Sequence, residues 1–457
     1  MVSSFSVKAG GLQRLAVGRR RRPLIPKEET VLRTGAMGRS GRKARQVLAT
    51  GLLAAGVMTV ATVSIAVVGI GTAGASSALG TAHPATLPAV TIGLISDGGG
   101  SSSIGTAALE EQGAKAAVAY ENQYGDGLEG HKITLYICEN QSTPAGGQTC
   151  ANDMVQHGVV AVVEPFTGQG QTEVPTIVGA GIPYITISGA STAELTSPGA
   201  FAIEGGFPAY LGAMALSAKQ HGLTKVAFLV DNVPAAIQGA QALGGIVFKA
   251  AGVGYTVIPV NSGTADMSPQ LQSAVSGGAQ AVGMVGDVTF CSSFLQAYNT
   301  LDLKIPKYVL STCQDPSILD SATLDKALAG SYITTTTQSS KSDLATYGAI
   351  IKKYDPKASP NPNISSNQAD GVTPVLTLAA IMKGSTQPVT AAGVKTQTET
   401  ANNVVIPLSG GLTFTCNGTA IPLLKSVCSS SAAIGVIQAG KTGKITGIKV
   451  YNPTPLF

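Results

Sequence analysis

The sequence predicts an α/β protein in which two doubly wound parallel sheets follow an N-terminal hydrophobic segment. Three observations predict this fold class. Segments with strand character are short and apolar throughout, the segments between them have the length and apolar spacing of helices, and the connections are short. Parallel strands that helices cover on both faces show this pattern, because neither face meets water.

The first group of elements begins at a β-branched apolar run, Val90–Ser96. In the next segment, residues 106–125, Leu109 and Gly113 recur at helical spacing. Further strands are expected at 132–138, 159–166 and 184–188, with helices at 146–158 and from Gln171 onward. Short strands joined by helices in this way predict one doubly wound sheet.

The second group of elements repeats the alternation. Strands are expected at 225–230, 255–260, 279–286 and 307–311, and helices at 235–252, 268–278 and 292–303. Residues 158–168 and 279–289 are similar, since each is a buried strand followed by Gly, Asp or Thr. Ligands of such sheets bind outside the carboxyl ends of the strands. The residues that follow the strands are therefore the candidate site.

Charge is distributed unevenly along the chain. Residues 1–46 form a basic leader with 12 of the 30 Lys and Arg residues and 2 of the 25 Asp and Glu residues. The remainder carries a formal net charge of −5 and has no basic run. A nucleic-acid partner is not expected, because phosphate binding needs clustered cations.

Residues 47–75 have the features of a signal or transmembrane segment. The apolar run at 47–70 is as long as the roughly 20 residues that cross a bilayer, basic residues precede it, and Ala73–Ala75 resembles a cleavage site. We expect the protein outside the cytoplasm, either secreted or tethered by residues 47–70 to the outer face of the cytoplasmic membrane. Cleavage and retention both stay open, as does a start at Met1 or Met37. Residues 76–88 are read as a linker.

Gly69, Gly71 and Gly74 match the GxGxxG pattern of dinucleotide-binding loops. The pattern lies inside the hydrophobic segment, and no acidic residue follows at the distance that a ribose contact requires. We therefore expect no dinucleotide, and no other cofactor.

The cysteines lie along the chain as three neighbouring pairs. The pairs are Cys138 with Cys150, Cys291 with Cys313, and Cys416 with Cys428. Six cysteines allow 15 connectivities, but local disulfides are expected in an exported chain because its compartment is oxidising. A metal site is not expected, since no CxxC occurs and the four His residues have no ligand spacing to the cysteines.

Several stretches together resemble the type I periplasmic binding proteins of the branched-chain amino acid group. They are VTIGLISDGG at residues 90–99, residues 113–168, GIPYITISGASTAEL at 181–195 and SGGLTFTCNG at 409–418. The resemblance covers roughly Val90 to Pro453 and implies two lobes, three hinge crossings and a ligand trapped between the lobes. The implied first lobe is 89–206 plus 339–430, and the second is 207–338 plus 431–457.

The resemblance also implies ligand-binding residues in the first lobe. Family members place Ser or Thr at two strand ends, and the matching positions here are Thr167 and 188–191. The first-lobe candidates are Ser102, Ser103, Thr167, Gly168, Gln169, Ser188, Gly189, Ala190 and Ser191. Ser191 and Glu194 also form an S-x-x-E capping box, so the Ser191 hydroxyl has an alternative role as a helix cap.

The second lobe departs from the family pattern of aromatic residues and a Glu. Its candidates are Val233, Pro234, Asp287, Val288 and Gln314. Asp287 is expected to pair an ammonium group, with a solvated turn as its alternative role. Without the family's aromatic residues, the solute is expected to be larger or less zwitterionic than leucine.

The expected function is solute binding for an ABC transporter. A small polar solute such as an amino acid binds between the lobes of a monomer and is delivered to a membrane permease. The alternative is a membrane-anchored ligand-binding sensor with the same lobes. An enzyme is not expected, because neither a GxSxG elbow nor a complete P-loop occurs.

Overall fold

The computed structural model describes residues 78–99, 106–335, 340–358, 367–439 and 443–457. The chain divides into two compact units, residues 1–67 and 68–457, and all described residues belong to the second. The predicted hydrophobic segment at 47–75 lies outside the described residues. In the part that is described, no helix combines the length and the hydropathy needed to cross a membrane.

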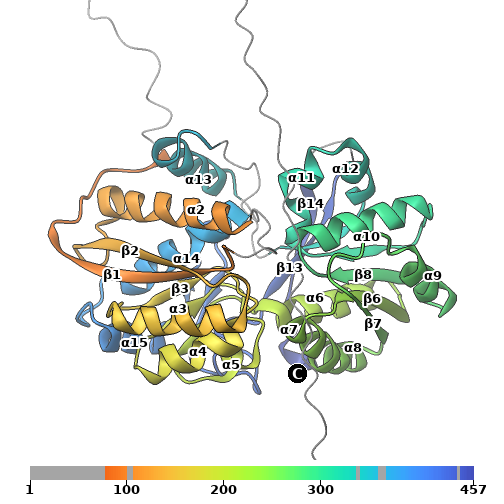
Figure 1. The fold of residues 1–457 in the computed structure, drawn as a ribbon, viewed down its shortest axis with the longest axis horizontal. Coiled ribbons are helices and arrows are strands. Elements are labelled where there is room, and N and C mark those ends of the chain that lie inside the picture. The colour runs from red at the N-terminus through yellow and green to blue at the C-terminus, as the bar shows by residue number, and fades with distance from the viewer. Residues whose placement is uncertain (1–77, 100–105, 336–339, 359–366, 440–442) are drawn as a thin grey trace, which may run out of the picture. The chain divides into compact units, whose positions relative to one another are not determined.

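The first sheet has five strands in the order β2-β1-β3-β4-β5 (Figure 1). Every neighbouring pair is parallel. The strands are β1 (Leu87–Ser96), β2 (His131–Glu139), β3 (Val162–Glu164), β4 (Tyr184–Thr186) and β5 (Ala200–Ala202). The parallel doubly wound sheet predicted for the first group of elements is confirmed.

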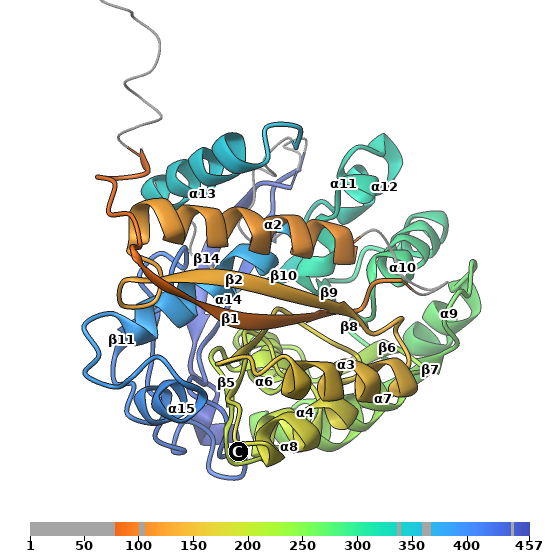
Figure 2. The same ribbon diagram turned by 60° about the vertical axis from the view of Figure 1, so that its left-hand side comes forward.

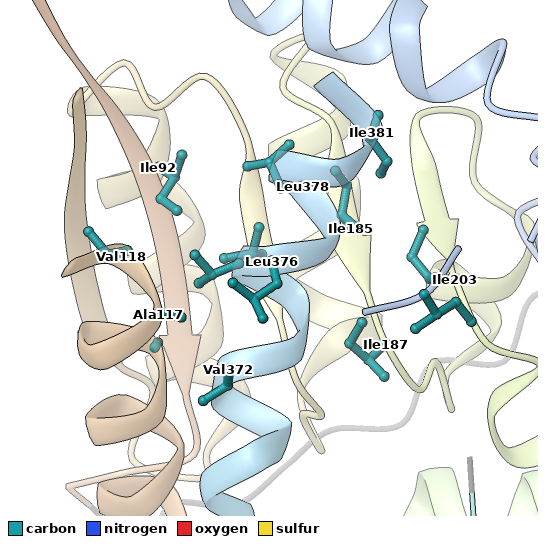
Figure 3. Packing of buried hydrophobic residues seen from close by; sticks show 14 of the residues in the cluster. Ile92, Ala117, Val118, Ile185, Ile187, Ile203, Val372, Leu376, Leu378 and Ile381 are labelled. Atoms are coloured by element: carbon teal, nitrogen blue, oxygen red, sulfur yellow. The ribbon is translucent and has the colours of Figure 1, made fainter. Parts of the chain in front are cut away.

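Helices cover both faces of the first sheet (Figure 2). They are α2 (Thr106–Tyr120), α3 (Pro144–Gln156), α4 (Gly170–Gly179), α5 (Thr192–Thr196), α13 (Lys341–Tyr354), α14 (Asn367–Met382) and α15 (Ala391–Glu399). Ile92 and Leu94 join a core cluster with α2 and α14, whereas Ile95 joins one with α3 and α4. Figure 3 shows Ile92 of β1, Ala117 of α2 and Val372 of α14 among the residues of the first of these clusters. Neighbouring residues of β1 therefore belong to different cores.

Glycines let α2 and α14 approach each other at the backbone. A Cβ on Gly113 would lie 2.0 Å from the carbonyl oxygen of Gln368, and one on Gly371 would lie 1.8 Å from that of Glu110. A side chain at either position would collide with the main chain of the other helix. Helix pairs packed this closely need small residues at the crossing.

The second sheet has seven strands in the order β14-β13-β10-β9-β8-β6-β7. They are β6 (Lys225–Asp231), β7 (Gly254–Val260), β8 (Ala281–Val285), β9 (Lys307–Val309), β10 (Tyr332–Thr335), β13 (Ala432–Ile437) and β14 (Ile445–Tyr451). β6 to β10 pair in parallel, but β13 is antiparallel to both β10 and β14. The parallel sheet predicted for the second group is present in β6 to β10, and β13 and β14 add an antiparallel edge to it.

Two core clusters also enclose the second sheet. Ala227 and Leu229 pack toward α9 and α10, while Val226 and Phe228 pack toward α6 and α8. The helices are α6 (Gly206–Gln220), α7 (Pro234–Gly239), α8 (Gly245–Ala251), α9 (Ser268–Ser276), α10 (Val288–Thr300), α11 (Pro316–Leu319) and α12 (Ala322–Leu328), with the π-helix η2 (Ala240–Gly244) and the 3-10 helix η3 (Ser311–Gln314).

The remaining elements are short. They are the π-helix η1 (Glu121–Gly125), the 3-10 helix η4 (Thr454–Leu456) and a two-stranded sheet of β11 (Val404–Val405) and β12 (Thr413–Phe414). The exact lobe boundaries given above stay a prediction.

Disulfides join the predicted neighbouring pairs of cysteines. Cys138 at the end of β2 is bonded to Cys150 of α3, Cys291 of α10 to Cys313 of η3, and Cys416 to Cys428. The first two bonds each tie a helix to a segment at the carboxyl end of a sheet. In the chain-entropy model, closing loops of this size stabilises the fold by about 3 kcal/mol each.

Replacing Gly113 should separate two effects of an added methyl group on stability: its collision with the neighbouring helix and its contribution to helix propensity. Gly113→Ala is expected to lower the free energy of unfolding by about 1–3 kcal/mol, because its methyl group forces α2 away from α14. Gly348→Ala in α13 is the control: its Cβ meets nothing within 4 Å, so a gain of about 0.4–1 kcal/mol is expected. Urea unfolding measures both, and equal changes would contradict the packing argument.

Candidate functional site

Polar side chains from the ends of β1, β2 and β3 meet in one hydrogen-bonded network. Asp97 follows β1, Asn140 follows β2 and Thr167 follows β3. The Asn140 amide nitrogen lies 2.6 Å from Asp97 Oδ1, and the Thr167 hydroxyl donates to the same oxygen at 2.8 Å. The backbone N–H of Gly168 donates to Asp97 Oδ2 at 2.9 Å. The Asp97 carboxylate thus joins three strand ends.

The Thr167 hydroxyl is fully used within this network. It donates to Asp97 and accepts from the backbone N–H of Gln169 at 2.9 Å and from the Asn140 amide at 3.2 Å. Only 2% of the residue is exposed. A hydroxyl has one donor and two acceptor sites. Thr167 therefore positions the loop here, and its predicted contact with a ligand stays a prediction.

Buried carboxyl groups lie beneath the network. Glu164 and Glu194 are completely buried, and neither Glu164 oxygen has a hydrogen-bond partner among the described residues. Burial, reinforced by the negative charge of Glu173, holds the pKa of Glu164 well above its usual range. Burial also raises the pKa of Glu173 to about 8, although Asn140 donates to it at 2.8 Å. These groups are neutral acids at low pH.

The end of β4 holds the other predicted first-lobe residues. Ser191 caps α5: its hydroxyl accepts from the Glu194 N–H, and the Glu194 carboxylate accepts from the Ser191 N–H at 2.8 Å. The same carboxylate accepts from the Ala190 N–H at 3.2 Å. The helix-cap alternative for Ser191 is thus present. Ser188 donates to the Tyr210 hydroxyl at 3.4 Å, and the Gly189 carbonyl accepts from the Phe207 N–H.

The predicted second-lobe residues lie at the ends of β6 and β8. Val233 is 41% exposed and precedes Pro234, the first residue of α7. Asp287 caps α10 by accepting from the Phe290 N–H at 2.7 Å. Asp287 is thus a helix cap, a role that neither sequence alternative included, because the helix starts four residues earlier than expected. Val288 is buried, 3% exposed.

Gln314, at the end of η3 after β9, is directed into the protein interior. Gln314 is completely buried, and its amide donates to the Gly443 carbonyl at 2.9 Å. Its neighbour Cys313 is held by the disulfide to Cys291. Ser102 and Ser103 lie outside the described residues.

Sequence reasoning missed two kinds of residue at this site. Asp97 and Asn140 organise the network; Asp97 directly follows the predicted strand at 90–96 and Asn140 comes two residues after the one at 132–138, which is the signal that could have identified them. Phe166 stands one residue before the predicted group that begins at Thr167, yet it is 49% exposed. A large aromatic side chain left exposed at a strand end is a candidate contact for an apolar part of a ligand.

The chemistry of the site favours binding a polar molecule with an apolar part. The described residues contain no arginine, so no guanidinium is available there to clamp a carboxylate. Among those residues no three His, Cys, Asp or Glu side chains are grouped to hold a metal ion. The network instead offers a spare lone pair on Asp97 Oδ2, which accepts only from the Gly168 N–H, and the exposed Phe166 lies two residues before Gly168 in the chain.

Removing the Thr167 hydroxyl should destabilise the fold. Thr167→Val leaves the Gln169 N–H without an acceptor and removes one donor from the Asp97 carboxylate, so a loss of about 1–3 kcal/mol is expected in urea unfolding. The exposed Thr196, whose hydroxyl bonds only its own helix, is the control and should change stability by less than about 0.5 kcal/mol on mutation to Val. A Thr167→Val protein as stable as the control would contradict the proposed positioning role.

The buried carboxyls should make the protein more stable in acid. A folded-state pKa of about 8 for Glu173, against 4.5 for the free group, means that the folded state binds the extra proton. This stability is complete below pH 4.5 and is lost as pH rises through 8. Urea midpoints should therefore be higher at pH 5 than at pH 8. Glu173→Gln should weaken this dependence and exposed Glu399→Gln should not; equal dependence in both variants would oppose this assignment.

Comparison with known proteins identifies the fold. Solved structures of similar fold include a leucine-binding protein from Thermotoga maritima, with a TM-score of 0.64 at 16% identity over 80% of this chain and 99% of that one. A fatty acid ABC transporter substrate-binding protein from Thermomonospora curvata has a TM-score of 0.65 at 13% identity. The match covers 82% of this chain and 96% of that one. A solute-binding protein from R. palustris in complex with 4-hydroxybenzoate has a TM-score of 0.62 at 16% identity. The match covers 80% of this chain and 98% of that one.

Sequence comparison supports the same assignment. A search of curated proteins found no match. The family model described as "Periplasmic binding protein" matches residues 89–422, which is most of the chain. The resemblance inferred from the sequence is confirmed, and the chain belongs to the periplasmic binding protein family.

Proposed function

We propose that the protein is an extracytoplasmic solute-binding protein of an ABC transporter. It traps a small polar solute, an amino acid or a related compound, between its lobes and delivers it to a membrane permease. The observation that carries this proposal is the network around the half-buried Asp97, which joins three strand ends, with the exposed Phe166 directly before Thr167 in the chain. Membership of the periplasmic binding protein family supports it.

The proposed solute contacts differ from those expected from the sequence. Asp97 is the proposed acceptor for an ammonium group, because its carboxylate lies where three strand ends meet and its Oδ2 accepts only the Gly168 N–H. Phe166 and Val233 are proposed to contact the apolar part of the solute, since both are exposed beside strand ends. Gln169, which is half-buried at the start of α4, is a further polar contact.

Proteins of similar fold are associated with solutes of different chemical classes. Proteins of similar fold are named for a fatty acid or solved in complex with isoleucine or 4-hydroxybenzoate. All three combine an apolar part with a carboxylate. For this chain we propose that backbone N–H groups and hydroxyls receive the carboxylate, because no arginine is available in the described residues.

Closure of the lobes is the proposed mechanism. A solute bound at the strand ends of one lobe would be enclosed when the other lobe rotates toward it, and the closed form would be presented to the permease. Because the solute gains contacts only in the closed form, it shifts the population toward that form.

Ligand-dependent unfolding of the full, oxidised chain tests the proposal. A panel of amino acids, amides, short peptides, fatty acids and aromatic acids is screened for a raised thermal midpoint. A ligand at 100 times its Kd stabilises the protein by about 2.7 kcal/mol, a clear shift. Phe166→Ala should abolish the shift and leave the unliganded midpoint nearly unchanged, because the ring is exposed.

The matched control is Leu87→Ala, since Leu87 is an exposed apolar residue, 45% accessible, at the start of β1, the opposite end of that strand from Asp97. It should keep the full ligand-dependent shift. If no compound moves the midpoint, the amino-acid assignment fails. If Phe166→Ala responds as the control does, the strand ends are not the binding surface.

A further inference from the structure

A pocket lies at the far end of α2 from the strand ends. It has a volume of about 440 Å³ and is lined by the end of α2, the π-helix η1 with the turn after it, the start of α13, the last turns of α14 and residues 407–408. This volume is within the range of small-molecule sites, about 300–1,000 Å³. The Ser96 hydroxyl, one residue before Asp97, donates to Glu111 of α2 at 2.9 Å, and the helix rises by about 14 Å from Glu111 to Tyr120 at the pocket. The pocket is therefore a different site.

Glu121 borders this pocket, and the Lys383 ammonium in the same lining attracts it without forming an ion pair. Only 7% of the residue is exposed, and its carboxylate has no hydrogen bond or ion pair within the described part of the chain. The carboxylate folds back over its own π-helix, where a Cβ on Gly125 would lie 1.7 Å from Glu121 Oε2. A buried carboxylate costs free energy unless something pairs with it. π-Helical turns are frequent at functional sites.

The charge of the lining favours a cation. Acidic residues outnumber basic ones four to one: Glu121, Asp126, Glu129 and Asp343 against Lys383. Glu129 and Asp343 are each held by a backbone N–H, that of Gly384 at 2.6 Å and that of Gly410 at 2.8 Å. No three acidic side chains in the described chain are close enough to hold a metal ion. An organic cation, which is larger, fits this spread of charge.

The other walls suit the body of an organic cation. Tyr120 and Tyr124 stack with ring centroids 5.7 Å apart, and Leu376 and Ala380 of α14 add apolar surface. The Lys353 ammonium already lies 4.3 Å from the Tyr124 centroid. The rings at this place therefore attract positive charge.

We propose that this pocket binds a small organic ammonium ion, with Glu121 as the buried counter-ion and the tyrosine pair and α14 as the apolar wall.

The protonation of Glu121 gives the proposal a distinctive signature. Burial raises the pKa of Glu121 to about 8, and Lys383 only partly opposes this. The other titratable groups around it are Tyr120, Tyr124, Asp126, Glu129 and Asp343. Near pH 7 Glu121 is mostly neutral. An arriving cation favours the ionised form, so binding releases a proton and tightens as pH rises toward 8.

Titration calorimetry with choline as the probe tests the proposal on the full, oxidised chain. We expect saturable binding of choline and at least about tenfold weaker binding of its neutral isostere 3,3-dimethylbutan-1-ol. Heats in phosphate and in Tris at pH 7 should show a released proton. Glu121→Gln, which copies the neutral acid, should weaken choline binding at least about tenfold and end the proton release. Glu399→Gln, at an exposed position, should change neither.

A second variant keeps the test decisive if Glu121→Gln does not fold. Ala380→Leu fills the pocket from α14 and should also abolish binding. The proposal is wrong if choline does not bind saturably, if the alcohol binds equally well, or if Glu121→Gln or Ala380→Leu binds like the wild type. Binding lost in Phe166→Ala but kept in Glu121→Gln would place the probe at the strand ends and overturn the proposal, leaving the proposed transport function intact.

Discussion

The contact between α2 and α14 is the constraint on which the first sheet depends. These helices are more than 240 residues apart in sequence, yet Gly113 and Gly371 bring their backbones together over the same face of the sheet. Because a parallel sheet must be covered on both faces, the returning helix α14 completes the core that α2 begins. The same contact fixes the position of both ends of α2, and each end carries a candidate site.

Buried acids give the first sheet an unusual electrostatic character. Glu164, Glu173 and Glu194 lie beneath the strand ends with no arginine among the described residues to pair them. Burial raises the pKa of all three, because ionising several of them together in a poorly solvated place would be costly. The half-buried Asp97 is instead satisfied by three donors, so one carboxylate can organise the strand ends.

The two ends of α2 present different chemistry. At its start, strand ends supply amides and hydroxyls that are already paired with one another, so a ligand there would meet a rigid polar surface beside exposed apolar side chains. At its end, Glu121 is unpaired and two tyrosine rings are stacked nearby. A preformed network suits selection by shape, whereas an unpaired buried acid suits selection by charge.

The sequence by itself determined the alternation of strands and helices, the local disulfides, the capping box at Ser191 and the family, because each depends on residues close together or on a linear pattern. Only the tertiary structure decided which polar groups are already hydrogen-bonded within the protein. Thr167 is engaged by Asp97 and Asn140, whose positions 70 and 27 residues away no local pattern encodes. The antiparallel edge at β13 and the burial of Gln314 against Gly443 were likewise unpredictable. Long-range packing sets such partners, and neighbouring residues in the chain do not reveal it.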